Sequence, residues 1–232
     1  MNDALDVVSA GVGPLRRRVR PTLAGISGLA HVALTFDDGP DPASTPSFVA
    51  LLERWDCRAT FFLLGQHVAP HAGLVRDLAD RGHELAVHGW DHRCVLRSGE
   101  AALVDDLRRT AATIEDLTGG PVTWYRPPYG VLGTHALRAA RRAGLRTVLW
   151  SAWGRDWERR ATPARIVTSV DRTLRPGGVV LLHDTDRTSA PGSWQRTLPA
   201  TEILLSRWSE AGLRVGPLSD HGLADDVRTR SR

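Results

Sequence analysis

Short apolar runs that end in turn residues alternate along this chain with segments whose apolar residues recur at helical spacing. Seven runs rich in β-branched and aromatic residues predict strands at residues 31–36, 60–64, 84–87, 122–125, 146–150, 179–182 and 214–215. Helical periodicity between them predicts helices at residues 43–57, 71–81, 101–117, 135–143, 163–174 and 197–211. This alternation predicts parallel strands joined by helices, either in an open doubly wound sheet or in a closed barrel.

The positions of the polar clusters favour the barrel. Polar or aromatic clusters follow five of the predicted strands, at residues 37–38, 88–92, 126–129, 156–157 and 183–184. The C-terminal ends of barrel strands converge on one mouth, whereas an open sheet spreads them along an edge. With 42% hydrophobic residues, the 232-residue chain can bury one sizeable core. We therefore predict an α/β fold, a distorted (β/α) barrel of about seven parallel strands in a single domain.

The same pattern sets the expected domain boundaries. We expect an Arg-rich leader segment at residues 1–30, the barrel domain at 31–218 and a tail at 219–232.

The formal charge of +4 comes entirely from arginine, because the chain contains no lysine. The arginines are not interleaved with aromatic residues as in a surface that follows a phosphate backbone, so we expect no nucleic-acid partner.

The N-terminal region lacks the order of basic, apolar and small residues that marks a secretory signal, and no run is long enough to span a membrane. The sequence therefore predicts a cytoplasmic protein without a transmembrane segment. Four clustered arginines leave two interpretations open: weak contact with anionic lipid at the inner membrane face, or a solvated leader. They are Arg16, Arg17, Arg18 and Arg20.

Two adjacent carboxylates, Asp37 and Asp38, end the first predicted strand, where Gly39 and Pro40 prevent its continuation. Successive side chains on extended backbone point in opposite directions, so the two acids can serve different tasks. One could hold a metal ion while the other reaches a bound water. The alternative is a solvated surface turn, because Asp, Gly and Pro are all turn formers.

His88 and His92 follow the third predicted strand and are four residues apart. At that spacing both imidazoles can face one point on a helical turn or a compact loop. Together with one carboxylate they form a set of two His and one Asp, which leaves coordination positions open for water and substrate, as hydrolysis requires. Taken alone, the pair is also explained by core or surface histidines.

Two further strand ends carry groups suited to acyl transfer. Arg126 precedes two prolines; its guanidinium could orient a carboxylate, and the stiffened backbone could donate an N–H to an oxyanion. His183 could protonate a leaving group if a carboxylate keeps it cationic, and Asp156 is our candidate for that carboxylate. Considered singly, Arg126 could face solvent and His183 could be structural.

Taken in order, these clusters resemble the polysaccharide deacetylase family, also called the NodB homology domain or carbohydrate esterase family four. Five motifs carry the resemblance, over about residues 31 to 215: Thr-Phe-Asp-Asp-Gly-Pro at 35–40, His88-x-x-x-His92, Arg-Pro-Pro-Tyr at 126–129, Asp-Trp at 156–157 and Leu-Leu-His at 181–183. The resemblance implies a distorted (β/α) barrel with fewer than eight strands. It also implies metal-dependent removal of an N- or O-acyl group, commonly acetyl from an amino sugar.

The resemblance implies a role for each matched residue. Asp37 would be the general base, oriented by Arg126, and the Tyr129 backbone N–H would stabilise the oxyanion. The metal would usually be zinc and sometimes cobalt or another divalent ion. Its protein ligands would be Asp38, His88 and His92.

On the same resemblance, His183 would be the general acid, held by Asp156. Trp157 and Leu181 would line the pocket for the acyl methyl group. The substrate would be an N-acylated sugar, glycan or glycolipid. Because one group must be ionised while the other is protonated, we expect a bell-shaped dependence of activity on pH.

Two positions depart from the family's pattern. Trp153 stands where an acid usually precedes the Asp-Trp motif, which puts the contacts of Arg126 in question. Gly89 stands where Ser or Thr usually follows the first histidine, so a hydroxyl that could support the loop is absent. Neither departure removes a proposed metal ligand or proton-transfer group.

Three other functions fit parts of this pattern. A catalytically inactive carbohydrate-binding protein could use the same scaffold, although decay would be expected to remove at least one of the five acids and histidines. A deformylase or amidase could act on a small non-carbohydrate substrate. Two histidines and one carboxylate could also form the facial triad of an iron oxygenase, but the spare adjacent acid and the separate His183 fit hydrolysis better.

Overall fold

The computed structural model describes residue 18 and residues 20–223 of the chain. Within this part, eight strands form one sheet in which every pairing is parallel. The sheet order is β5-β4-β3-β2-β1-β7-β6, and β8 pairs with the first half of β1. The strands are β1 (His31–Asp37), β2 (Thr60–Leu63), β3 (Glu84–Val87), β4 (Trp124–Tyr125), β5 (Arg146–Thr147), β6 (Ala152–Trp153), β7 (Val179–His183) and β8 (Arg214–Gly216).

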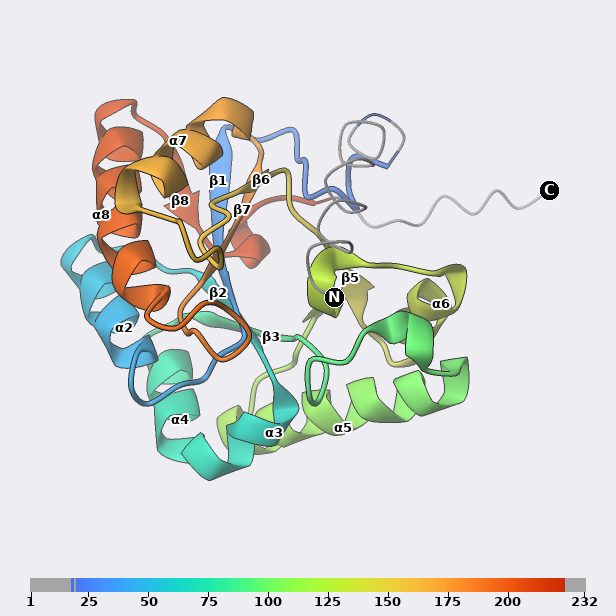
Figure 1. Ribbon diagram of the computed structural model, residues 1–232. Coiled ribbons are helices and arrows are strands. Elements are labelled where there is room, and N and C mark those ends of the chain that lie inside the picture. The colour runs from blue at the N-terminus through green and yellow to red at the C-terminus, as the bar shows by residue number, and fades with distance from the viewer. Residues whose placement is uncertain (1–17, 19, 224–232) are drawn as a thin grey trace.

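Helices surround this sheet (Figure 1). In Figure 1, α2, α7 and α8 cover one side of the strands, and α4, α5 and α6 continue around the other. The α-helices are α2 (Thr45–Arg54), α3 (Gly65–Val68), α4 (Ala72–Asp80), α5 (Glu100–Thr118), α6 (Thr134–Arg142), α7 (Pro163–Thr173) and α8 (Trp194–Glu210). Short 3-10 turns lie at Ala69–His71, Val95–Arg97, Pro128–Gly130 and Leu218–Asp220.

The sheet curls into an incomplete barrel, as the sequence predicts. Its two edge strands, β5 and β6, are separated in sequence only by residues 148–151, so the two edges must lie close to each other. Between them the backbone leaves the sheet: Leu149 N donates to Leu23 O, and Leu149 O accepts from Arg126 Nη2. For this reason the strand expected at 146–150 ends at Thr147, and β6 is an additional short strand.

Alternate residues of the strands fall into two apolar clusters, and this alternation decides which side chains reach the mouth. Val32, Leu34 and Phe36 of β1 pack with residues of the surrounding helices. Ala33 belongs to the second cluster, whose buried residues come from strands, loops and the 3-10 turn at Leu218–Asp220 and fill the barrel. Continuing the interior positions along the strands leads to the catalytic candidates at one end: Asp37 on β1, His88 after β3, Arg126 after β4 and His183 on β7.

The opposite end of the barrel is closed by polar contacts. Glu84 of β3 accepts from Thr60 Oγ1 at 2.7 Å, from Trp124 Nε1 at 3.0 Å and from Ser219 N at 3.1 Å. Leu23 and Leu223, on either side of the strand region, belong to the apolar cluster inside the barrel. The proposed boundaries at residues 30 and 218 stay predictions.

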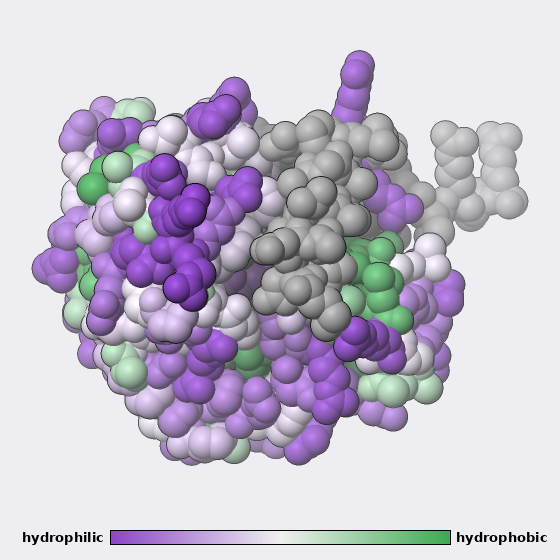
Figure 2. All heavy atoms as spheres, viewed as in Figure 1, coloured by the Kyte–Doolittle hydropathy of each residue, from purple (hydrophilic) through white to green (hydrophobic). Residues whose placement is uncertain are grey.

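One face of the molecule is mainly hydrophilic. On the face in Figure 2, hydrophilic residues predominate and hydrophobic ones form small patches. Within the described residues, no helix combines the length and the apolar character that crossing a bilayer demands. Of the four arginines proposed to touch lipid, Arg16 and Arg17 lie outside the described residues, and Arg18 and Arg20 are exposed.

A buried histidine pair joins β1 to the chain after β8. His31 Nδ1 and His221 Nδ1 are 2.9 Å apart, and His221 Nε2 is 3.3 Å from Gly25 O. Because a carbonyl only accepts, His221 carries its hydrogen on Nε2, so its Nδ1 accepts from His31. Burial lowers the pKa of both imidazoles, that of His221 to about 4.

This pair predicts acid-sensitive stability. The unfolded imidazole binds protons below about pH 6.5, whereas folded His221 resists them down to about pH 4, so stability present at neutral pH is lost as the pH falls through this range. We expect His221 to remove about 2 kcal/mol from the free energy of unfolding between about pH 7 and about pH 5. Urea unfolding at a series of pH values measures this slope. Replacing His221 with Gln should flatten it, and an unchanged slope would contradict the assignment.

Candidate active site

The carboxylates of Asp37 and Asp38 both lie near His88 at the end of β1, although adjacent side chains on a strand would point in opposite directions. Asp37 is the last strand residue, whereas Asp38 has left-handed backbone with φ of 78°. Asp tolerates this conformation better than most residues. Asp38 Oδ1 lies 3.3 Å from His88 Nε2, and Asp37 Oδ2 lies 3.8 Å from the same atom. Strand alternation therefore does not apply at Asp38, because the chain has already left the strand there.

Asp38, His88 and His92 form a group that could hold a metal ion. One ligand atom from each residue lies within 4.8 Å of the others. Asp38 Oδ1 is 3.3 Å from His88 Nε2 and 3.4 Å from His92 Nε2. This oxygen is buried and has no hydrogen-bond partner. A buried carboxylate oxygen without a donor is expensive unless a cation satisfies it.

The histidine loop is held by backbone contacts rather than by a hydroxyl after His88. Gly89 has φ of +90°, a conformation that L side chains rarely adopt, and its carbonyl accepts from Gly65 N. Trp90 N donates to Asp106 Oδ2 at 3.1 Å. The departure at Gly89 thus matches the backbone conformation, and α5 supports the loop through Asp106.

A hydrogen bond orients the imidazole of His88, and burial keeps the imidazole of His92 neutral. His88 Nδ1 donates to the Arg126 carbonyl at 2.8 Å, which leaves Nε2 as the nitrogen that faces Asp38. Burial lowers the pKa of His92 to about 4, so its imidazole is neutral at pH 7. Burial would raise the pKa of Asp38, but the neighbouring His92, His88 and His183 lower it well below its usual range. Two imidazole nitrogens beside an ionised carboxylate are a donor set for a divalent cation.

Arg126 is completely buried and faces Asp37. Its Nη1 donates to Asp37 Oδ1 at 2.7 Å and to Thr35 Oγ1 at 2.8 Å, while Nη2 donates to Leu149 O at 3.0 Å. The guanidinium also lies 4.0 Å from the centre of the Phe62 ring. Without an acid at position 153, a hydroxyl and a backbone carbonyl accept two of the guanidinium's hydrogens, while Arg126 Nε is buried without a hydrogen-bond partner.

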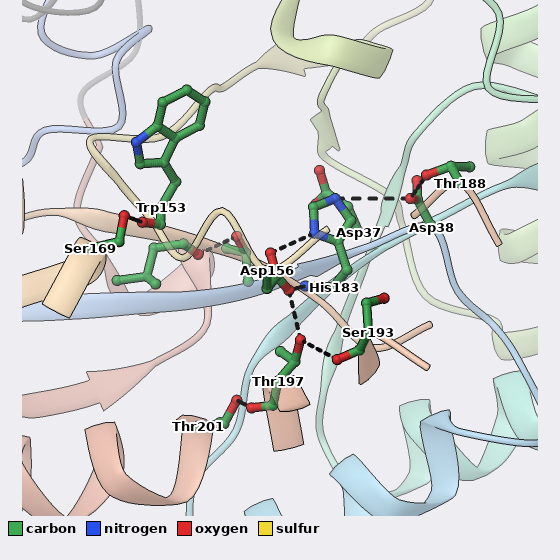
Figure 3. A network of polar contacts seen from close by, with 12 residues as sticks. Asp37, Asp38, Trp153, Asp156, Ser169, His183, Thr188, Ser193, Thr197 and Thr201 are labelled. Atoms are coloured by element: carbon green, nitrogen blue, oxygen red, sulfur yellow. Dashed lines mark hydrogen bonds and ion pairs between the residues drawn. The ribbon is translucent and has the colours of Figure 1, made fainter. Parts of the chain in front are cut away.

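His183 is held by Asp156 (Figure 3). Asp156 Oδ1 accepts from His183 Nδ1 at 3.0 Å, and Oδ2 accepts from His183 N at 2.7 Å and from Thr197 Oγ1 at 3.0 Å. Burial would lower the pKa of His183, but Asp156 raises it to about 10. The imidazole can thus carry a proton at neutral pH. Its Nε2 points toward Asp38, with 3.9 Å to Oδ2.

Four of these side chains, Asp37, His88, His92 and His183, line one cavity. Trp157 and Leu181 line it, as does Tyr129, which has left-handed backbone with φ of 61°. The ring of Trp157 lies 5.5 Å from that of His183. The residues lining the cavity are Asp37, His88, His92, Pro127, Tyr129, Gly130, Trp150, Trp153, Trp157, Leu181, His183, Thr188 and Ser189.

All ten residues proposed from the sequence therefore lie in or directly beneath one cavity. Other residues around the site have no role predicted from the sequence, among them Thr35, Trp150, Thr188 and Thr197. Thr35 lies inside the first motif, and its position two residues before Asp37 could have identified it. Trp150, Thr188 and Thr197 lie outside the motifs, and no sequence signal marked them.

Comparisons with known sequences show which family the chain resembles. The profile of the polysaccharide deacetylase family matches residues 27–148. A chitooligosaccharide deacetylase of Bradyrhizobium sp. (strain ANU 289) is 35% identical over 211 residues, which cover 86% of this chain and 94% of the relative. A peptidoglycan-N-acetylglucosamine deacetylase of Listeria monocytogenes is 36% identical over 161 residues, or 69% of this chain, but this chain spans only 34% of that protein.

Solved structures share the fold. A family 4 carbohydrate esterase from Streptomyces lividans in complex with acetate matches with a TM-score of 0.71 and 32% identity, covering 80% of this chain and 91% of that chain. A CE4 family pseudoenzyme from Bacillus anthracis matches with a TM-score of 0.76 and 25% identity, covering 85% of this chain and 66% of that chain.

Proposed function

The chain belongs to the polysaccharide deacetylase family, and we propose that it is an active, metal-dependent hydrolase that removes an N-acyl group, most simply acetyl, from an amino sugar or N-acetylated glycan. One observation carries the proposal: the Asp-His-His group, a spare carboxylate and a carboxylate-bound histidine converge on one cavity. Chito-oligosaccharides and peptidoglycan fragments are the first substrates to test, because similar proteins are named for them.

Asp38, His88 and His92 would hold the metal, and the residues present fit it. The buried Oδ1 of Asp38 lacks a donor, and the Nε2 atoms of both histidines face it. Two nitrogens and one oxygen suit zinc best, with cobalt or another divalent ion as the alternative. When bound, the ion would lower the pKa of a water and so supply a nucleophile at neutral pH.

Asp37 would accept the proton of that water. Arg126 holds its Oδ1, so Oδ2 is the oxygen that faces the cavity and His88. Arg126 also donates a hydrogen bond to Thr35, so the guanidinium that holds the Asp37 carboxylate is itself held in place before the substrate binds. We assign Asp37 as the general base and Arg126 as its positioning residue.

His183 would give a proton to the departing amine, and Asp156 would keep it oriented and cationic. The apolar surfaces of Trp157 and Leu181 would contact the acyl methyl group. The left-handed backbone of Tyr129 turns at the cavity wall, and we assign its N–H to the developing oxyanion.

A second candidate is a carbohydrate-binding protein that has lost catalysis. It is kept because one of the similar structures is described as a pseudoenzyme of this family. The complete set of acids and histidines favours the active enzyme. The two differ in acetate release, whereas both could bind a glycan.

The deciding experiment measures zinc content and acetate release from chito-oligosaccharides and peptidoglycan fragments. We expect the wild type to bind one zinc ion and release acetate, and His88→Ala to lose both. His71→Ala, outside the lining of this cavity, is the matched control and should keep both. Zinc binding without acetate release from any substrate would favour the binding protein, and absence of zinc after reconstitution would refute the metal assignment.

A further inference from the structure

The two oxygens of Asp38 have different surroundings. Oδ1 faces the two histidines and has no hydrogen-bond partner. Oδ2 accepts a hydrogen bond from the hydroxyl of Thr188, which belongs to the loop between β7 and α8 (Figure 3). Thr188 lies outside all five motifs, yet it is in direct contact with the carboxylate at the centre of the site.

The loop that carries Thr188 is fastened on both sides of it. On one side, Thr185 Oγ1 donates to Asp41 Oδ2 at 2.7 Å, and Arg187 Nε lies 3.3 Å from the same oxygen. On the other side, Ala190 N donates to Trp157 O at 3.0 Å. The hydroxyl of Thr188 is thus held in place by contacts with the chain after β1 and with the cavity wall, independently of any ligand.

A second group lies within reach of Oδ2. His183 Nε2 is 3.9 Å from it, somewhat longer than a hydrogen bond. Without the Thr188 hydroxyl, Asp38 could rotate to pair with His183, and Oδ1 would then turn away from His88. A bonded hydroxyl donor on a ligating carboxylate fixes which oxygen faces the ion.

We propose that Thr188 is a positioning residue of the metal centre: its hydroxyl occupies Oδ2 of Asp38 and so reserves Oδ1 as the ligand atom. The inference rests on the proposed metal-dependent function. It adds to the metal centre a residue outside the family's motifs. That residue belongs to a loop that is hydrogen-bonded to Asp41.

Zinc affinity measured by competition with a chromophoric chelator tests this role apart from catalysis. We expect Thr188→Val, which keeps the shape and loses the hydroxyl, to weaken zinc binding about 10- to 100-fold. Thr188→Ser keeps the hydroxyl and should stay within about threefold of the wild type. Thr113→Val is the matched control, because that hydroxyl donates to the Arg109 carbonyl within α5 and does not line the cavity.

The outcomes separate this inference from the function on which it rests. If the wild type binds zinc and Thr188→Val binds it equally tightly, the positioning role is refuted and the metal site stands. If Ser weakens binding as much as Val does, the hydroxyl is not the cause and the role is again refuted. A wild type that binds no zinc would refute both. Should the Val variant fail to fold, Thr188→Ala removes the same hydroxyl without a branched side chain and carries the same expectation.

Discussion

Replacing Asp37 with Asn is expected to lower turnover of an N-acetylated sugar about 1,000-fold while leaving zinc content unchanged. General bases typically contribute 10²- to 10⁴-fold, and Asn keeps the shape and an oxygen that can accept from Arg126 but cannot take a proton. Zinc should remain because Asp37 is not one of the three clustered ligands. Metal analysis and acetate release on the same sample measure both effects.

The control for Asp37→Asn is the same substitution at an exposed ion pair. Asp171 pairs with Arg207 at the surface, and Asp171→Asn should leave turnover and zinc unchanged. If Asp37→Asn lost zinc as well as turnover, Asp37 would be a ligand and the division of roles between the adjacent acids would be wrong. If turnover stayed within tenfold of the wild type, another group would have to be the base.

The fold could be predicted from sequence because its signals are local and repeated. Each long strand is an apolar run, and the structure confirms the single-domain barrel with parallel strands and surrounding helices. β6 could not be predicted, because two residues carry no periodicity and their place is set by pairing with β7. The early end of β5 likewise depends on a partner far away in sequence, Leu23, which draws Leu149 out of the sheet.

The sequence predicted the site residues whose chemical type the reaction requires, but it did not predict the backbone geometry that sets where their side chains lie. The sequence indicates the two acids and two histidines, and their convergence follows from their places at strand ends. That Asp38 reaches His88 depends on a left-handed residue, which strand alternation does not foresee. At Arg126, which the sequence could pair only with an acid, Thr35 and Leu149 accept from Nη1 and Nη2, and Nε is left without a hydrogen-bond partner.

Thr188 shows why part of a site is missed. Its loop has no regular secondary structure, and its contact with Asp38 spans 150 residues of sequence. Hydroxyl residues are common in loops, so composition gives no signal. Thr188 is identified only from the structure, by the hydrogen bond that joins its loop to Asp41 and by the different surroundings of the two Asp38 oxygens.

Replacing His183 with Asn is expected to lower hydrolysis of an N-acetyl amide at least 100-fold and hydrolysis of p-nitrophenyl acetate less than tenfold. An amine is a poor leaving group and must take a proton as the carbon–nitrogen bond breaks, whereas p-nitrophenolate leaves without one. Asn can still donate to Asp156, so the local hydrogen bonding survives. Rates on the two substrates, compared within each variant, measure the difference.

The comparison of two substrates separates proton donation from every other role of His183. A loss of packing against Trp157 or a disturbed metal site would lower both rates by the same factor, because attack on the carbonyl carbon is common to both reactions. Asp156→Asn provides a second test: it leaves His183 in place but removes the charge that raises the pKa of its imidazole. It should therefore show the same preference for the ester to a smaller degree. Equal losses on both substrates in His183→Asn would assign the histidine to the attack step instead.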